Sequence, residues 1–385
     1  IPVPPKIRNF RGRLARAQSD TRKLDEAVRE CRERIRSARR PVLIGGVELF
    51  RAGAEGDFLQ LAEKLGAPVV TTLLAKGVFP MDHPQHMGIH MGPFSAKPIQ
   101  DRVRSADLVL AMGTQLTDMN LGAARPQVQR EHAVWATGGR VNVSFHTYTD
   151  VKLGDFVGAL AEGKHPTFRE AIAYHDNLKR KPARKASLPL RINDMLLELN
   201  DFLEECPDYH VVAESGDSLF GGLELRVQGP GLYMAQGYYA SMGFGVPAAL
   251  GAQIGTGRRP LLLTGDGAFQ MTGMEISHAP RYGLSPIVVL VNNAGWQIFR
   301  PVSPRTDLLE VPPWPYAELA QAWGGVGFRA ETREELRDAL RAAHEVRDFS
   351  LIECTVPQDD LSPITKRYIR ESARKAKAGA RRKKS

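Results

Sequence analysis

The chain has 385 residues, 43% of them hydrophobic, which is enough for two globular domains with separate cores. No apolar run approaches the roughly 18–20 residues needed to cross a bilayer, and no charged-then-apolar secretory leader opens the sequence, so we expect no membrane partner. The three cysteines are odd in number and outside any CxxC pair. This argues against a disulfide framework and a thiolate metal site, and predicts a reducing, cytoplasmic location.

The formal net charge of +9 comes entirely from the C-terminal end. Residues 366–385 contain ten Lys or Arg and one acid, Glu371, so the rest of the chain is formally neutral. This segment has no aromatic interleaving beyond Tyr368. We therefore expect residues 358–385 to be a disordered, solvated tail rather than a nucleic-acid-binding arm.

The first half of the chain alternates helical and strand patterns. Apolar residues at helical spacing predict an amphipathic helix over residues 24–40, and a short apolar run ended by glycines predicts a strand over 41–46. A helix around 58–65 and strands at 67–72, 108–113 and 140–143 follow. This order predicts a doubly wound parallel sheet in a central domain over residues 1–162.

A second domain follows a stretch rich in Lys, Arg, Pro and Ala, which predicts a linker over residues 163–189. Helices are expected at 192–203 and 334–345, and strands at 209–213, 260–264, 287–291 and 350–355. These elements predict another open parallel sheet, over residues 190–357. The fold class is therefore α/β, with two doubly wound parallel-sheet domains.

Polar and glycine residues follow two strands of the second domain. One strand runs into Gly265-Asp266-Gly267, and the next runs into Asn292-Asn293. Because carboxyl ends of neighbouring parallel strands face one crevice, a carboxylate and a carboxamide can converge there on one ion. Such oxygens suit Mg²⁺, and the glycines and helix N-terminus suit a diphosphate. A GDG tripeptide alone is a common turn, so the extended pattern carries the prediction.

The extended pattern resembles a known family. Residues 213–220 (AESGDSLF), 237–255, 264–276 and 286–300 are similar to the cofactor-binding domain of indolepyruvate and phenylpyruvate decarboxylases, within the wider pyruvate decarboxylase family. Residues 41–160 resemble the central domain of these enzymes more weakly. The resemblance implies a thiamine diphosphate- and Mg²⁺-dependent carbon–carbon lyase. Its expected reaction is non-oxidative decarboxylation of an aromatic 2-oxo acid to an aldehyde and carbon dioxide.

The resemblance also assigns residues. Asp266, Asn293 and the carbonyl of Gly295 match the metal ligands. Met242 matches the apolar residue that bends the cofactor, and it is the one catalytic residue that the resemblance assigns to this chain. The implied cofactor-binding set is Ser215, Gly216, Asp217, Ser241, Met242, Gly265, Asp266, Gly267, Ala268, Asn293, Gly295, Trp296 and Ile298.

The catalytic glutamate of the family belongs to an N-terminal pyrimidine-binding domain, which this sequence does not contain. Two explanations stay open: a truncated form of a three-domain enzyme, which the first residue Ile1 in place of Met favours, or a split enzyme with a separate small subunit. In either case the expected partner is a pyrimidine-binding segment or subunit that carries the glutamate, within a homo- or hetero-oligomer.

The substrate pocket departs from the pyruvate decarboxylase pattern. Six positions after Asn293, where those enzymes carry a glutamate, this chain has Phe299. An apolar lining favours a bulky substrate. Two alternatives remain: a carboligase of the same fold, similar to acetolactate synthase, and a non-catalytic subunit that keeps the cofactor cleft. The intact Asp266, Asn293 and Gly295 count against the second alternative.

Overall fold

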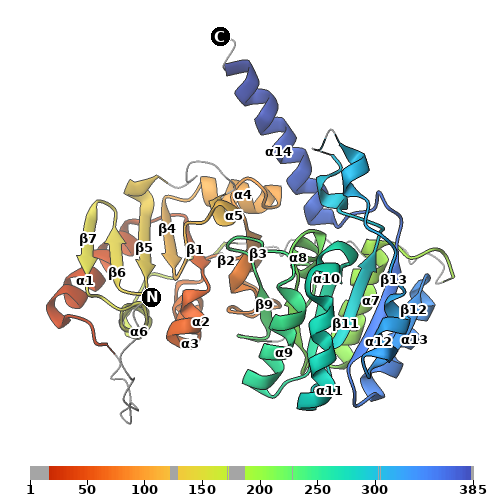
Figure 1. The fold of residues 1–385 in the computed structure, drawn as a ribbon. Coiled ribbons are helices and arrows are strands. Elements are labelled where there is room, and N and C mark those ends of the chain that lie inside the picture. The colour runs from red at the N-terminus through yellow and green to blue at the C-terminus, as the bar shows by residue number, and fades with distance from the viewer. Residues whose placement is uncertain are drawn as a thin grey trace, which may run out of the picture.

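Two β-sheets organise the chain (Figure 1). The structure is a computed structural model that describes residues 17–121, 129–170, 172, 187–227, 229–301, 303 and 305–382. One sheet has seven strands and the other has six, and helices cover both. The expected α/β fold with two sheet domains is confirmed.

The central domain holds the seven-stranded sheet, with strand order β3-β2-β1-β4-β5-β6-β7. Its strands are β1 Pro41–Gly45, β2 Val69–Thr72, β3 His86–His90, β4 Leu108–Met112, β5 Ala133–Thr137, β6 Arg140–Val143 and β7 His146–Thr149. Its helices are α1 Thr21–Ser37, α2 Glu48–Ala52, α3 Glu55–Leu65, η1 Leu73–Ala75, α4 Lys97–Arg104, α5 Asp118–Leu121, η2 Arg130–His132 and α6 Leu153–Glu162.

The expected parallel sheet is confirmed for the first five strands and wrong for residues 140–143. β6 pairs antiparallel with β5, and β7 antiparallel with β6. Only Gly138 and Gly139 separate β5 from β6, and two residues allow a hairpin but no crossover.

Burial in the central domain follows the sequence pattern. Every residue of β1 is buried, and Val42 and Leu43, adjacent residues within this strand, belong to cores on opposite faces of the sheet. Phe58 of α3 and Phe156 of α6 pack on one face, and Ile99 of α4 packs on the other. A sheet covered on both faces explains why its strands read as unbroken apolar runs.

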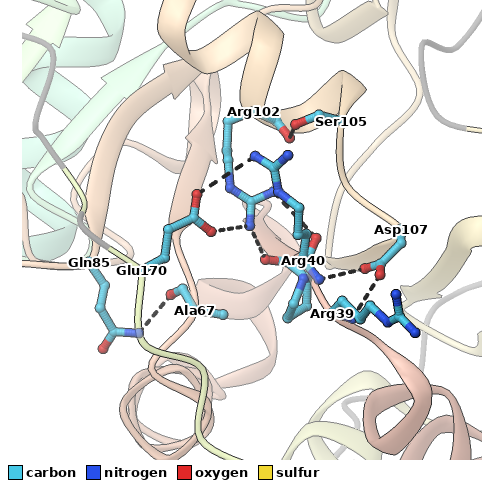
Figure 2. A network of polar contacts seen from close by, with 9 residues as sticks. Arg39, Arg40, Ala67, Gln85, Arg102, Ser105, Asp107 and Glu170 are labelled. Atoms are coloured by element: carbon cyan, nitrogen blue, oxygen red, sulfur yellow. Dashed lines mark hydrogen bonds and ion pairs between the residues drawn. The ribbon is translucent and has the colours of Figure 1, made fainter.

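Part of the predicted linker belongs to the central domain. Glu170 accepts a hydrogen bond at 2.8 Å from the buried guanidinium of Arg102, which also donates to the carbonyls of Arg40 and Pro41 (Figure 2). This end of the predicted linker is therefore attached to the central domain, because a buried guanidinium needs acceptors and Glu170 supplies one. Residues 171 and 173–186 of the predicted linker lie outside the described residues.

The second domain holds the six-stranded sheet, with order β12-β13-β11-β10-β8-β9 and every pairing parallel, as expected. Its strands are β8 His210–Ala213, β9 Tyr233–Ala235, β10 Pro260–Gly265, β11 Ile287–Asn292, β12 Val326–Ala330 and β13 Ser350–Thr355. Its helices are α7 Ile192–Glu205, α8 Asp217–Gly222, α9 Gly245–Thr256, α10 Asp266–Thr272, η3 Gly273–His278, α11 Ala279–Tyr282, η4 Gln297–Phe299, η5 Thr306–Leu309, α12 Tyr316–Ala322, α13 Arg333–Glu345 and α14 Pro363–Arg382.

The two domains share buried contacts. Leu73, Met91 and Phe94 of the central domain belong to the main core of the second domain. The buried amine of Lys76 donates at 2.9 Å to the carbonyl of Leu223, across the same junction. Apolar side chains of both domains are therefore buried together at this junction.

The prediction of a disordered tail is wrong for its described part. α14 begins at Pro363, its first turn contains the buried Ile364 and Thr365, and its far end projects away from both domains (Figure 1). Ser362 accepts a hydrogen bond from the N–H of Thr365 and so caps the helix. A few apolar residues and a cap order the start of this helix, although basic residues dominate its composition.

No helix in the described part of the chain combines the length and apolar character that a membrane crossing requires. Cys31, Cys206 and Cys354 are free thiols.

Candidate functional site

The carboxyl ends of β10 and β11 meet at one edge of the second sheet. The strands pair in parallel with Gly265 opposite Val291, and α10 begins directly after β10. Asp266 accepts hydrogen bonds from the N–H of Gly267 at 2.7 Å and from the N–H of Gly295 at 3.1 Å. The two motifs that the sequence placed at this edge are therefore in direct contact.

Asp266 is a buried carboxylate at this contact, with only 2% of its surface exposed. Burial raises the pKa of Asp266 to about 6, although backbone N–H groups, first that of Gly267, oppose the shift. The two hydrogen bonds, from Gly267 and Gly295, leave further lone pairs of the carboxylate free. A cation bound here would stabilise the charged form and use the remaining acceptor positions.

The two asparagines after β11 have different surroundings. The side chain of Asn292 donates to Glu353 at 2.8 Å and accepts from the N–H of Ala294 at 3.3 Å. Its amide is therefore engaged in hydrogen bonds at the edge of the sheet. Asn293 is buried and lies beside Asp266 in the wall of a cavity. This arrangement favours Asn293 over Asn292 as the metal ligand.

The loop after Asn293 requires glycine. Gly295 has φ +152°, and a Cβ there would lie 2.1 Å from the carbonyl oxygen of Leu309. Trp296 follows and covers Gly267, where a Cβ would lie 2.9 Å from the indole ring. Two glycines therefore let the backbone of α10 and the loop approach each other closely.

The loop after β8 supplies a second set of polar groups. Gly216 has φ +78° and turns the chain into α8. The buried Glu214 accepts from the N–H of Ser215 at 2.8 Å and from that of Gly245 at 2.6 Å, which ties this loop to α9. The hydroxyl of Ser215 is buried and finds no hydrogen-bond partner among the described residues. A buried hydroxyl without a partner is costly, so the position fits a ligand contact.

Met242 lies on the loop between β9 and α9. The side chain of Gln236 accepts from the N–H groups of Tyr239 and Ala240, and Ala240 adopts the unusual φ of +58°. This turn leaves Met242 41% exposed in the cavity wall. The neighbouring Ser241 is exposed and does not line the cavity.

A cavity of about 360 Å³ joins these loops. Its wall contains all of the predicted cofactor-binding residues except Ser241. It also contains residues that sequence reasoning missed, namely Met119, Ile192, Met195, Leu196, Phe220, Tyr368, Ile369 and Ser372. These come from α5, α7, α8 and α14. Phe220 ends the segment 213–220 that carries the family resemblance, and Tyr368 is the lone aromatic residue of the basic segment. No motif marks the others.

Comparison with known proteins identifies the chain. Residues 214–354 match the family described as thiamine pyrophosphate enzyme, C-terminal TPP binding domain, and residues 28–152 match thiamine pyrophosphate enzyme, central domain. The chain belongs to the thiamine pyrophosphate enzymes.

Decarboxylases resemble the chain along most of its length. It is 34% identical to the indole-3-pyruvate decarboxylase of Azospirillum brasilense, over 91% of this chain and 65% of the relative. It is 32% identical to pyruvate decarboxylase 4 of Arabidopsis thaliana, over 91% of this chain and 59% of the relative. The chain thus spans somewhat less than two thirds of these relatives. The crystal structure of benzoylformate decarboxylase from Polynucleobacter necessarius shares the fold, with a TM-score of 0.77 at 20% identity, over 93% of this chain and 68% of that one.

The cavity fits thiamine pyrophosphate, also called thiamine diphosphate. One end offers backbone N–H groups at the start of α10, the unpartnered hydroxyl of Ser215 and the close approach at Gly267. Within the described residues no three His, Cys, Asp or Glu gather to form a metal site. The predicted ligands, Asp266 with the amide oxygen of Asn293 and the carbonyl of Gly295, would offer a metal ion a hard oxygen set that suits Mg²⁺.

Proposed function

We propose that the protein is a thiamine diphosphate- and Mg²⁺-dependent decarboxylase that converts an aromatic 2-oxo acid to an aldehyde and carbon dioxide. The observation that carries this proposal is a single cavity with two kinds of wall. Asp266, Asn293 and Ser215 lie at its polar end, and apolar side chains surround the rest.

The polar end supports binding of the diphosphate. Asp266, Asn293 and Gly295 would hold Mg²⁺, and the backbone of Gly267 and Ala268 at the start of α10 would face the phosphate oxygens. Met242 would support the bent form of the cofactor, because a methionine is bulky, apolar and adaptable. When bound, thiamine diphosphate supplies the nucleophilic carbon and the electron sink that the loss of carbon dioxide requires.

The apolar wall supports an aromatic substrate. Met119, Ile298, Phe299, Tyr368 and Ile369 line it, from α5, the loop after β11 and α14. An aryl or indolyl group would bury its surface against these side chains. The relatives named above include an indole-3-pyruvate decarboxylase, which agrees with this substrate class.

The charge of the cavity supports decarboxylation. None of the described residues that line it is Lys, Arg or His. A substrate carboxylate would therefore lose hydration without gaining a cationic side chain from this chain. Such surroundings disfavour the carboxylate and favour its departure as neutral carbon dioxide.

The other end of the cofactor would be held by a further pyrimidine-binding segment that carries a glutamate, either in the same protein or in a partner chain. The surface beside the cavity supports such an association. Tyr239, on the loop between β9 and α9, is 82% exposed, and its neighbour Tyr238 is also exposed. Met271 of α10 and Met274 of η3 are exposed as well. Exposed apolar groups of this kind mark interaction surfaces. We also propose an oligomer in the cytoplasm, where free thiols persist.

The test is carbon dioxide release by the full-length protein with thiamine diphosphate and Mg²⁺. We expect turnover of phenylpyruvate and indolepyruvate with kcat/KM well above that of pyruvate, and loss of turnover when EDTA removes the metal. Turnover of pyruvate at least as efficient as that of both aromatic acids would refute the substrate class. Full turnover in EDTA would refute the metal.

A further inference from the structure

The start of α14 is joined to the cofactor cavity by the partly buried carboxylate of Asp217. Asp217 lines the cavity and accepts a hydrogen bond at 2.6 Å from the hydroxyl of Ser362, the residue before α14. The N–H of Ser362 also donates to Asp217, at 3.1 Å to Oδ1 and 3.0 Å to Oδ2. Ser362 is completely buried, 145 positions from its partner in the sequence. The cap of α14 is therefore also a support for a residue of the cavity.

The following turns of α14 close one side of the cavity. Tyr368, Ile369 and Ser372 belong to its wall. The ring of Tyr368 lies 4.5 Å from that of Phe94 in the central domain and is stacked 5.0 Å from that of Phe220. Residues 363–372 thus contact both domains and the cavity at once.

A second attachment reinforces this position. Arg367 donates from Nε to the carbonyl of Phe94 at 2.8 Å, and Lys366 lies 2.9 Å from the buried carboxylate of Asp360. Asp360 in turn accepts from the N–H of Ile192 at the start of α7. Beyond these contacts the helix leaves the protein body (Figure 1).

We propose that Ser362 is a positioning residue that orients Asp217, so that docking of residues 363–372 and binding of thiamine diphosphate stabilise each other. The proposal rests on the cofactor site proposed above.

The physical basis is the shared carboxylate. Burial raises the pKa of Asp217, and the hydrogen bonds from Ser362 and Thr365 lower it. When α14 is docked, these donors hold the carboxylate in one orientation toward the cavity. When α14 leaves, Asp217 loses them and the cavity loses a wall. Because coupling between two equilibria is reciprocal, the cofactor must favour docking by the factor with which docking favours the cofactor.

Limited trypsin digestion of the full-length protein reads the docking directly. Arg367 and Arg370 lie in the attached part of α14, whereas the Lys and Arg residues beyond Arg374 lie in the projecting part and serve as an internal control. With saturating thiamine diphosphate and Mg²⁺, we expect cleavage after Arg370 to slow about tenfold and cleavage beyond Arg374 to keep its rate.

The variant Ser362→Ala removes the hydroxyl donor. We expect it to abolish the cofactor-dependent protection and to weaken thiamine diphosphate binding, measured by calorimetry, by the same factor of about ten. Ser362→Thr retains a hydroxyl and should restore both. A chain ended after Arg374 should bind the cofactor like the wild type. A purely structural role of Ser362 would raise cleavage in both states without changing the ratio between them.

The outcomes separate the two proposals. If the wild-type protein does not bind thiamine diphosphate in calorimetry, the proposed cofactor site is wrong. If the wild type binds it but cleavage after Arg370 keeps its rate, the coupling is wrong, whether or not the variants fold. Equal cofactor affinity of the wild type and Ser362→Ala would also overturn it.

Discussion

Asp266→Asn should separate metal binding from folding at the cofactor site. In the metal-free chain, burial raises the pKa of Asp266 from 3.8 to about 6, so at pH 7.5 its ionised form costs about 3 kcal/mol of folding free energy. An amide removes this cost. It has one oxygen, however, so one of the N–H groups of Gly267 and Gly295 loses its acceptor, at about 1–3 kcal/mol. The net change in the free energy of unfolding should be within about 2 kcal/mol of zero.

Cofactor binding by the same variant should fall sharply. Removing one partner of a buried charge pair costs about 2–5 kcal/mol, which weakens Mg²⁺-dependent thiamine diphosphate binding by at least about 30-fold. Urea unfolding in EDTA measures the first effect and calorimetry with Mg²⁺ measures the second. A variant destabilised by more than about 3 kcal/mol that binds the cofactor normally would refute the reasoning.

The pH dependence of stability tests whether ionised Asp266 destabilises the metal-free fold. The folded metal-free chain holds the proton of Asp266 up to about pH 6, and the unfolded chain releases it near 3.8. The wild type should therefore lose stability relative to Asp266→Asn as the pH rises from about 4 to about 6, and keep this penalty above that range. Parallel stability curves over this interval would contradict the assignment of a buried, uncompensated carboxylate.

Two further predictions follow from buried groups. Gly267→Ala places a Cβ 2.9 Å from the indole of Trp296 and should cost about 1–3 kcal/mol in urea unfolding, whereas Gly265→Ala meets nothing within 4 Å and should leave stability nearly unchanged. Burial lowers the pKa of Lys76 from 10.5 to about 7, so between these pH values the unfolded chain keeps a proton that the folded chain releases. The free energy of unfolding of the wild type should therefore rise relative to that of Lys76→Met between about pH 7 and 10, by at most about 1.4 kcal/mol per pH unit.

The cofactor site illustrates what sequence reasoning can reach. Gly265, Asp266 and Asn293 could be placed together because the carboxyl ends of parallel strands meet at one sheet edge. Applying this rule requires no knowledge of tertiary contacts. The choice of Asn293 over Asn292 came from the family resemblance, and the structure adds a reason: Asn292 is bonded to Glu353 on a neighbouring strand. Ser241 has the right neighbours in sequence but lies outside the cavity wall.

The chain ends and connections were harder to predict. Residues 163–170 look like a linker because of their composition, yet Glu170 accepts a hydrogen bond from the buried Arg102. The basic residues after position 366 obscured a helix whose attachment depends on a few buried groups, above all Ser362 and Ile364. Composition averages over a segment, whereas a single buried contact decides whether that segment is ordered.

The sequence by itself determined the two parallel-sheet domains, the diphosphate and metal motif and the family, because each depends on local periodicity or on residues close along the chain. Only the tertiary structure decided that α14 forms part of the cavity wall and that Ser362 donates a hydrogen bond to Asp217, 145 positions away. Such a pairing leaves no local pattern, since it forms only when the packing of both domains brings distant segments together.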